Sequence, residues 1–382
     1  MGSFGTVFLW LVFVLQGAFC ILLIAGWRRL ATAVTPAVGS APLTQITPAF
    51  NERRHLSLLD QGLSRAAGTG LSYILVDDGS TDGSTVALER LACENGARFC
   101  RLSENRGKAA ALNAGLSHAE TRDVLFIDAD TTIGAAELQS LASRAGVCAS
   151  DAVALNIEPL PSDRWLVSLQ RAEYLYVLNF ERAGLAGFGF FMTVPGAASI
   201  WRRDAILEAG GFSSRTVSED TDMTLTLQAR GGRITIVRDC TASTDCPNTF
   251  AALLRQRARW IWGNLGASYY HGLDAARRRS AATNRAPGIA AAVLSCIQIL
   301  SYLVLTISGF RLAANDLGPG DAMPIAAILA IALARLWSVR FFLGSRSPGI
   351  IVALVQLTVI QAINLLAFWW GMLTGMPWRR YW

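Results

Sequence analysis

"SYILVDD" at residues 72–78 is an apolar run that ends in two acids, and "DVLFIDAD" at residues 123–130 repeats that design. Runs of this length and composition are typical of buried strands. Between them, "STVALERLACENG" at residues 84–96 predicts a helix that stops at Asn-Gly. This β-α-β order predicts an α/β fold with a doubly wound parallel sheet, in which ligands bind beyond the carboxyl ends of the strands. We therefore expect the acids to lie where a ligand binds.

The composition predicts a polar domain framed by membrane segments. The 382 residues are 52% hydrophobic and only 16% charged, with a mean hydropathy of +0.36, which is too apolar for an ordinary soluble enzyme. The net charge is +6, but the basic residues gather beside apolar segments rather than on one face. Membrane proximity explains that distribution better than nucleic acid, so no nucleic-acid partner is expected. The seven cysteines form no CxxC pair and indicate reduced thiols facing a cytoplasm.

Apolar segments near both ends predict membrane helices. Residues 5–27 carry no charge and are long enough to span a bilayer, and the "RR" that follows predicts a cytoplasmic flank. About three further spans are predicted within residues 287–376, from apolar stretches at 287–310, 323–344 and 348–376. One span before the polar domain and three after it would place both ends of the chain outside the cytoplasm. The basic "WRRYW" at the C-terminal end conflicts with this, because basic flanks are expected on the cytoplasmic side. The number and orientation of the later spans stay open.

The acids at the predicted strand ends favour a nucleotide site. Asp128 and Asp130 follow one apolar run, and their oxygen atoms suit Mg²⁺ or Mn²⁺ bound to a diphosphate. A lone D-x-D is more often a strand end capped by soluble acids. Asp77 and Asp78 add a second acid-tipped strand, although they also suit a loop that caps the next helix. No G-x-G-x-x-G or P-loop pattern occurs, so neither a dinucleotide site nor a P-loop is supported.

Two later motifs suggest chemistry on an acceptor. "VSEDTD" places Glu219 and Asp220 before a helical run, where acids cap the helix or where Asp220 acts as a general base. "LLRQRARWIWGN" at residues 253–264 combines arginines with tryptophans. Guanidinium groups brace a departing diphosphate, and an indole face stacks on a sugar ring. The same run also suits a helix at the membrane interface, and the two roles are compatible.

An ordered set of motifs spans residues 45 to 265: "TPAFNE", "VDDGSTD", "NRGKAAALNAG", "IDADT", "VPGAASIWRRDAILEAGGF", "SEDTD" and "QRARW". In this order and before membrane spans, it resembles the processive family 2 membrane β-glycosyltransferases, the synthases of cellulose, chitin, hyaluronan and poly-N-acetylglucosamine. The resemblance implies a GT-A domain, Rossmann-like and cytoplasmic, over residues 42–250. It also implies interfacial helices at 251–285 and an inverting transfer from a UDP-sugar.

The resemblance also assigns roles to individual residues. The residues implied to bind the donor nucleotide are Pro48, Phe50, Glu52, Asp77, Asp78, Lys108 and Asp128. Phe50 stands where the family has tyrosine, and Lys108 is the only lysine of the chain. Asp130, with Asp128, would hold Mg²⁺ or Mn²⁺. The residues implied in catalysis are Asp220 as the base, its neighbour Glu219, and Gln256, Arg259 and Trp260 of the Q-x-x-R-W motif.

The implied function is addition of a sugar to a growing β-linked polysaccharide, coupled in some relatives to export. "SLQRAEYLYVLNFER" at residues 168–182 favours UDP-N-acetylglucosamine as donor, with UDP-glucose next. The expected partners are the UDP-sugar, a polysaccharide acceptor, membrane lipid and export or accessory membrane proteins. The expected location is the bacterial inner membrane, multi-pass. Two alternatives stay open: a lipid glycosyltransferase that adds one sugar, similar to ceramide glucosyltransferases, and an inactive nucleotide-binding homologue.

Overall fold

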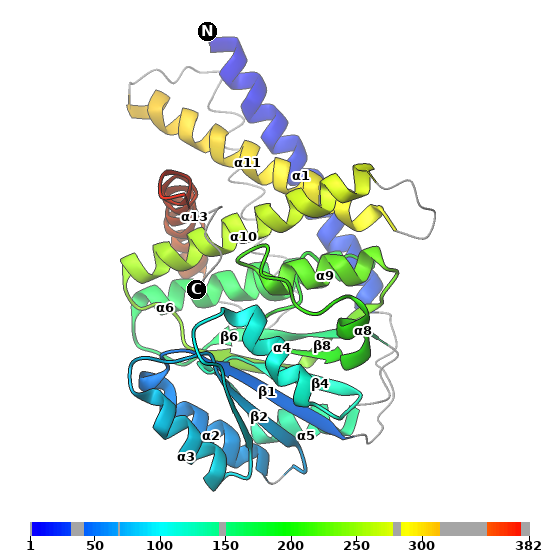
Figure 1. Ribbon diagram of the computed structural model, residues 1–382. Coiled ribbons are helices and arrows are strands. Elements are labelled where there is room, and N and C mark those ends of the chain that lie inside the picture. Colours follow the sequence, from blue (N-terminus) through cyan, green and yellow to red (C-terminus); the bar gives the residue numbers. More distant parts are fainter. Residues whose placement is uncertain are drawn as a thin grey trace.

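The computed structural model describes residues 2–31, 42–67, 69–144, 150–277, 284–313 and 350–375. Figure 1 shows a sheet domain with long helices gathered on one side of it. The predicted span at residues 323–344 lies outside the described residues.

One mixed sheet organises the domain. Its strands, in chain order, are β1 (Leu43–Ala49), β2 (Ser72–Asp77), β3 (Arg98–Arg101), β4 (Asp123–Ile127), β5 (Thr131–Ile133), β6 (Ala152–Pro159), β7 (Ala198–Arg202) and β8 (Ile234–Thr244). In space they follow the order β3-β2-β1-β4-β7-β6-β8-β5. β1 pairs in parallel with β2 and with β4, as the two acid-tipped runs predicted.

The prediction of a parallel doubly wound sheet was wrong for two strands. β7 runs antiparallel to both β4 and β6, and β5 runs antiparallel to β8. The cause for β7 lies in the preceding loop, residues 187–197. The loop ends at the carboxyl end of β4, where the N–H of Asp128 donates to the carbonyl of Ala197. Because the chain enters the sheet from that edge, β7 must run in the opposite direction to β4.

Alternating side chains give the sheet a core on each face. In β4, Leu125 and Ile127 face one core while Val124 and Phe126 face the other. This is the period of two that a pleated strand imposes. The first core is covered by α2 (Leu56–Ala67), α3 (Ser84–Glu94) and α5 (Ala135–Arg144). The second is covered by α4 (Lys108–His118), α8 (Arg203–Glu208) and α9 (Glu219–Ala229).

A long helical run changes its winding midway. It consists of α6 (Trp165–Glu173), the π-helix η2 (Tyr174–Glu181) and α7 (Arg182–Ala186). π-helical turns are rare and occur frequently at functional sites. Asn179 in η2 exchanges hydrogen bonds with the backbone of Ile157, so the run lies along β6.

The N-terminal segment is helical, as predicted, and packs on the domain. α1 (Gly2–Ala31) meets α7 where Gly26 faces Gly184, and neither residue has room for a side chain there. The indole N–H of Trp27 donates to the carbonyl of Phe180 at 3.1 Å. Trp27 and Leu23 are buried in the second core. The C-terminal half of α1 is therefore part of the folded domain.

Three long helices complete the described chain: α10 (Phe250–Arg277), α11 (Ala286–Ala313) and α13 (Ile350–Leu373). The Trp262 indole of α10 stacks on Phe368 of α13 at 5.2 Å. Within the described ranges, only residues 286–307 of α11 form a helix long and apolar enough to cross a membrane, judged by length and composition. The apolar part of α13, Val359–Leu373, is shorter. Membrane spans at both ends of the domain are thus not established.

Candidate active site

Lys108 lies at the centre of a partly buried cluster of acids. It is the first residue of α4, and its Nζ lies 2.5 Å from Oδ1 of Asp128 and 3.7 Å from Oε1 of Glu219. Asp128 follows β4, and Glu219 opens α9. The start of α4, the end of β4 and the start of α9 lie far apart in sequence. Together they place Lys108 and Asp128, assigned to donor binding, beside Glu219, assigned to catalysis.

Burial and charge shift the pKa values in this cluster. Burial raises the pKa of Asp128 to about 6 against the opposing effect of Lys108. Burial likewise raises the pKa of Glu219 to about 7, with Lys108 opposing and Asp220 adding to the rise. Burial alone would lower the pKa of Lys108, but Asp128 and Glu219 hold it above its usual range. One fixed cation thus faces several carboxyls, and the site favours additional positive charge.

Asp220 is held by two backbone N–H groups. Its Oδ2 accepts from Gly196 at 2.9 Å and its Oδ1 from Thr221 at 2.7 Å. A Cβ on Gly196 would lie 2.9 Å from Oδ2 of Asp220 and 3.3 Å from Nζ of Lys108. Only glycine lets the loop before β7 approach both groups so closely. The loop thereby orients the carboxylate that the sequence predicts as the base.

Asp77 and Asp78 are fully buried and organise the neighbouring loops. Asp77 accepts from the N–H of Ser80 at 2.9 Å, in the turn before α3. Asp78 accepts from the N–H groups of Arg106 and Gly107, at 2.9 and 2.8 Å, immediately before Lys108. Asp78 therefore fixes the start of α4 and the position of the lysine. Direct contact of either aspartate with uridine stays a prediction.

The predicted nucleotide residues at the end of β1 lie beside this loop. Pro48 is paired with Val76 in the sheet, and Phe50 follows β1 as a partly buried residue. Asn51 has a φ of 58°, and its side-chain oxygen accepts from the N–H of Thr81 at 2.8 Å. This contact ties the end of β1 to the loop after β2.

Asp130 belongs to a second group of polar side chains, and its charge adds to the rise in the pKa of Asp128 that burial causes. Its Oδ1 accepts from the hydroxyl of Thr131 at 3.1 Å and from that of Thr244 at 3.3 Å. Burial raises the pKa of Asp130, and the charge of Glu52 raises it further. Glu52, predicted on the donor side, therefore lies near the predicted metal ligand.

His55 is a residue that the motifs did not reveal. Its Nδ1 lies 2.5 Å from Oε2 of Glu52 and its Nε2 3.1 Å from Oδ2 of Asp245. Burial alone would lower the pKa of His55, but the hydrogen bonds to Asp245 and Glu52 raise it to about 9. A protonated imidazole thus links the end of β1 to the end of β8. Its spacing of three residues from Glu52 was the only sequence signal.

The Q-x-x-R-W segment lies in α10. Its buried arginine is Arg257, whereas the motif assigns the diphosphate to Arg259. Arg257 is buried, and its Nη2 lies 2.6 Å from Oε2 of Glu173 in α6. Its guanidinium lies 4.3 Å from the centre of the Trp260 ring. Arg259 is only partly buried. The contact of Arg259 with the diphosphate therefore stays a prediction.

Trp260 and Gln256 lie outside the Lys108 cluster. The Trp260 ring lies 6.1 Å from that of Tyr174, at the start of η2. The Oε1 atom of Gln256 is buried and has no hydrogen-bond partner in the described part of the chain. Burial raises the pKa of the Cys246 thiol to about 11, while the charge of Arg257 lowers it and that of Asp130 raises it. Cys246, shortly before α10, therefore lies near both Arg257 and the D-x-D motif.

The acids fit a divalent cation shared with a substrate. Across the described ranges, no three His, Cys, Asp or Glu side chains are grouped as a metal site. Mg²⁺ commonly needs only one or two carboxylates besides substrate phosphates. Burial raises the pKa of both Asp128 and Asp130, so a bound cation would stabilise their charged forms.

Comparison with known proteins identifies a family for this chain. The model of the glycosyl transferase family group 2 matches residues 124–339. An N-acetylglucosaminyltransferase of Sinorhizobium fredii is 32% identical over 248 residues, which cover 60% of this chain and 59% of that protein. A poly-beta-1,6-N-acetyl-D-glucosamine synthase of Staphylococcus aureus is 27% identical over 191 residues, or 50% of this chain and 46% of that protein. The matches thus span about half to three fifths of these relatives.

The fold is also similar to a solved structure. A mannosyltransferase of Pyrobaculum calidifontis, in complex with GDP-Man and Mn2+, superposes with a TM-score of 0.67 at 18% identity, covering 96% of this chain and 99% of that one. The domain is therefore a mixed α/β fold of the GT-A type.

The chain belongs to the family 2 glycosyltransferases. Its curated relatives include an N-acetylglucosaminyltransferase and a poly-N-acetylglucosamine synthase.

Proposed function

We propose that this enzyme transfers N-acetylglucosamine from UDP-N-acetylglucosamine to a growing β-linked polysaccharide, with inversion at the anomeric carbon. The named relatives support this choice of sugar. The observation that carries the proposal is the setting of Asp220, whose carboxylate is fixed by two backbone N–H groups beside Lys108.

In the proposed reaction, a hydroxyl of the acceptor attacks the anomeric carbon of the donor. Asp220 takes the proton of that hydroxyl, the bond from the anomeric carbon to the diphosphate breaks, and UDP leaves with the electron pair. A positioned general base contributes roughly 10²–10⁴-fold to such a step. Lys108 holds Asp128 and lies close to Asp220, so the donor and acceptor sides meet at this lysine.

The leaving diphosphate needs positive charge. Asp130, with Asp128, would hold Mg²⁺ or Mn²⁺, and the metal would neutralise charge on the departing diphosphate. Arg259 would grip the same group through its planar guanidinium. Trp260 would stack on the acceptor sugar, as indole rings do on flat sugar faces.

The proposed location is a membrane. α11 contains the apolar helix at residues 286–307, and α1 has no charged residue before Arg28. We propose membrane helices on both sides of the domain and a cytoplasmic active site, in line with the positive-inside tendency at Arg28 and Arg29.

The test is Asp220→Asn. Transfer of radiolabelled sugar by purified membranes should fall at least 100-fold, while UDP affinity stays within about twofold, because a base contributes little to holding the nucleotide. Product size on a gel separates the alternatives. A ladder or smear supports a polymerase, and one lipid-soluble product supports the single-sugar lipid transferase. Turnover similar to wild type would refute the assignment of Asp220.

A further inference from the structure

Two residues of α10 contact the two residues that follow Asp220. The Thr221 hydroxyl donates to Oδ1 of Asn264 at 2.7 Å. The Nε2 atom of His271 lies 2.9 Å from Oδ1 of Asp222. Asn264 and His271 are seven positions apart, so they lie on one face of α10 about two turns from each other. The first turn of α9 is therefore attached to α10 at two points.

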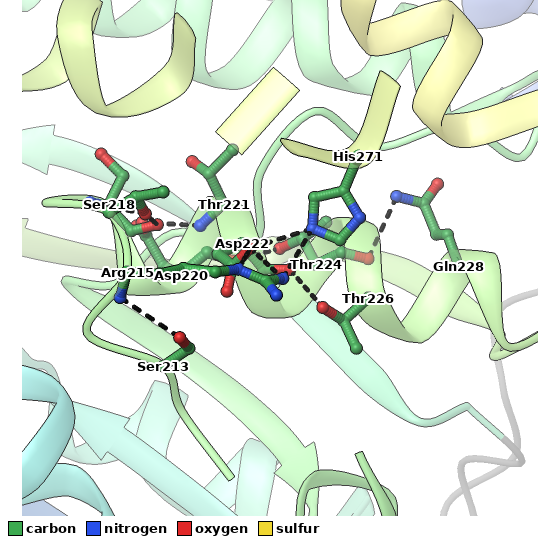
Figure 2. A network of polar contacts seen from close by, with 11 residues as sticks. Ser213, Arg215, Ser218, Asp220, Thr221, Asp222, Thr224, Thr226, Gln228 and His271 are labelled. Carbon is green, nitrogen blue, oxygen red and sulfur yellow. Dashed lines mark hydrogen bonds and ion pairs between the residues drawn. The ribbon is translucent and has the colours of Figure 1, made fainter. Parts of the chain in front are cut away.

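The attachment at Asp222 is buried and carries several donors. Figure 2 shows Asp222 between His271 and Arg215, which comes from the loop before α9. Arg215 donates to Oδ1 of Asp222 from Nε at 2.9 Å and from Nη2 at 2.6 Å. Hydrogen bonds between charged partners are roughly twice as strong as neutral ones. The network thus fixes both the start of α9 and the loop that leads to it.

Two glycines of α10 also lie close to side chains of the segment before Asp220. Gly263 of α10 faces Ser218, and any side chain at position 263 would overlap the Ser218 hydroxyl. Gly266, one turn further along α10, lies beside Thr216. Because two glycines face the residues before Asp220, α10 lies directly against that segment.

Thr221 joins a third element. Its hydroxyl lies 3.0 Å from that of Thr193, in the loop that also brings the Gly196 N–H to Asp220. The residue next to Asp220 thus contacts the loop on one side and Asn264 of α10 on the other. Any shift of α10 relative to α9 must break or move these contacts.

We propose that Thr221, Asn264 and His271 are positioning residues, which set Asp220 relative to α10, the helix that carries Trp260. The inference rests on the proposed role of Asp220 as the base. If Trp260 holds the acceptor sugar, these contacts fix the distance between the acceptor hydroxyl and the carboxylate that takes its proton. Their loss should therefore lower turnover and leave donor binding intact.

The test compares two threonines of the same helix. Thr221→Val removes the hydroxyl that contacts α10. Thr226→Val removes a hydroxyl whose hydrogen bond, among the described residues, goes to the carbonyl of Asp222 within α9. Thr221→Val should lower kcat roughly 10-fold to 100-fold, as expected for a misplaced reacting group. Its KM for the UDP-sugar and its unfolding temperature should match those of Thr226→Val. Thr221→Ser, which keeps the hydroxyl, should restore kcat to within about twofold of wild type.

A second arm tests the partners on α10. Asn264→Leu should lower kcat as Thr221→Val does, and the double variant should lose little more, because both changes remove one contact. His271→Phe should lower kcat without raising the donor KM.

Three outcomes would overturn the inference: equal kcat in Thr221→Val and Thr226→Val, failure of Thr221→Ser to recover, or a donor KM that rises as kcat falls. If Asp220→Asn is inactive while Thr221→Val turns over normally, only this inference fails. If Asp220→Asn is active, the proposed role of Asp220 as the base is refuted, and the inference loses its premise.

Discussion

The backbone N–H of Gly196 donates to Oδ2 of Asp220 at 2.9 Å, and a Cβ added to Gly196 would lie 2.9 Å from the same oxygen. That Cβ would also lie close to the amino group of Lys108. A single glycine thus controls how closely the loop before β7 approaches both charged groups.

Gly196→Ala should therefore reduce turnover by roughly 10-fold to 100-fold, because the new methyl group must displace Asp220 or Lys108. Gly62→Ala is the matched control, since a Cβ at position 62 meets no atom within 4 Å. The measurement is the initial rate of sugar transfer at equal membrane insertion. Equal rates for the two variants would contradict the proposed constraint.

Activity should depend on a divalent ion bound through Asp130. After washing with EDTA, transfer should fall to background and return with Mn²⁺ or Mg²⁺, because the leaving diphosphate carries charge that the protein alone neutralises only in part. Asp130→Ala should weaken Mn²⁺ binding at least 10-fold, measured by titration in the presence of UDP. Full activity in excess EDTA would rule out this role.

Arg259→Lys should lose activity although its charge is kept. Lysine lacks the planar fork that binds two oxygens of a diphosphate, so we expect a loss of about 10-fold or more in kcat/KM. Arg255→Lys, at an exposed position four residues earlier on α10, is the control and should be nearly silent. A kcat/KM of Arg259→Lys within about twofold of wild type would correspond to a free-energy change under ~0.5 kcal/mol. That result would assign Arg259 to the membrane interface instead of the diphosphate.

His55 makes stability depend on pH. Its pKa is raised to about 9 in the folded protein, above the ordinary value of 6.5. The stabilisation is therefore fully present below pH 6.5 and is lost as the pH rises through about 9. Between these values, the unfolding temperature of wild type should fall more steeply than that of His55→Gln. His118→Gln should keep the wild-type slope, and parallel curves for wild type and His55→Gln would disprove the link.

Two central strands could be predicted from local pattern. The apolar runs at residues 72–78 and 123–130 form β2 and β4, and the acids at their ends mark the expected ligand edge. Which core each side chain of Val124–Ile127 faces could not be predicted, because all four residues are apolar. The direction of β7 could not be predicted, because it depends on the loop before it. That loop is held by the contact between Gly196 and Asp220, which lie 24 residues apart.

The candidate site was predictable where motifs exist and not where contacts are long-range. Asp128 and Lys108, predicted separately, are joined by an ion pair. His55 and Asp245 lie 190 residues apart, and nothing local links them. In the run of three arginines before Trp260, choosing the buried one requires knowing where Glu173 lies, and α6 supplies Glu173 from another part of the fold.

The packing of α1 determines how the enzyme can be made soluble. Leu23 is fully buried and Trp27 nearly so, against Phe180 and the second core, whereas Val7 and Val14 are exposed. A shortened protein that starts at residue 42 would expose Phe180 to water, and we expect it to aggregate. The useful place to cut lies within the helix, between the exposed Val14 and the buried Leu23.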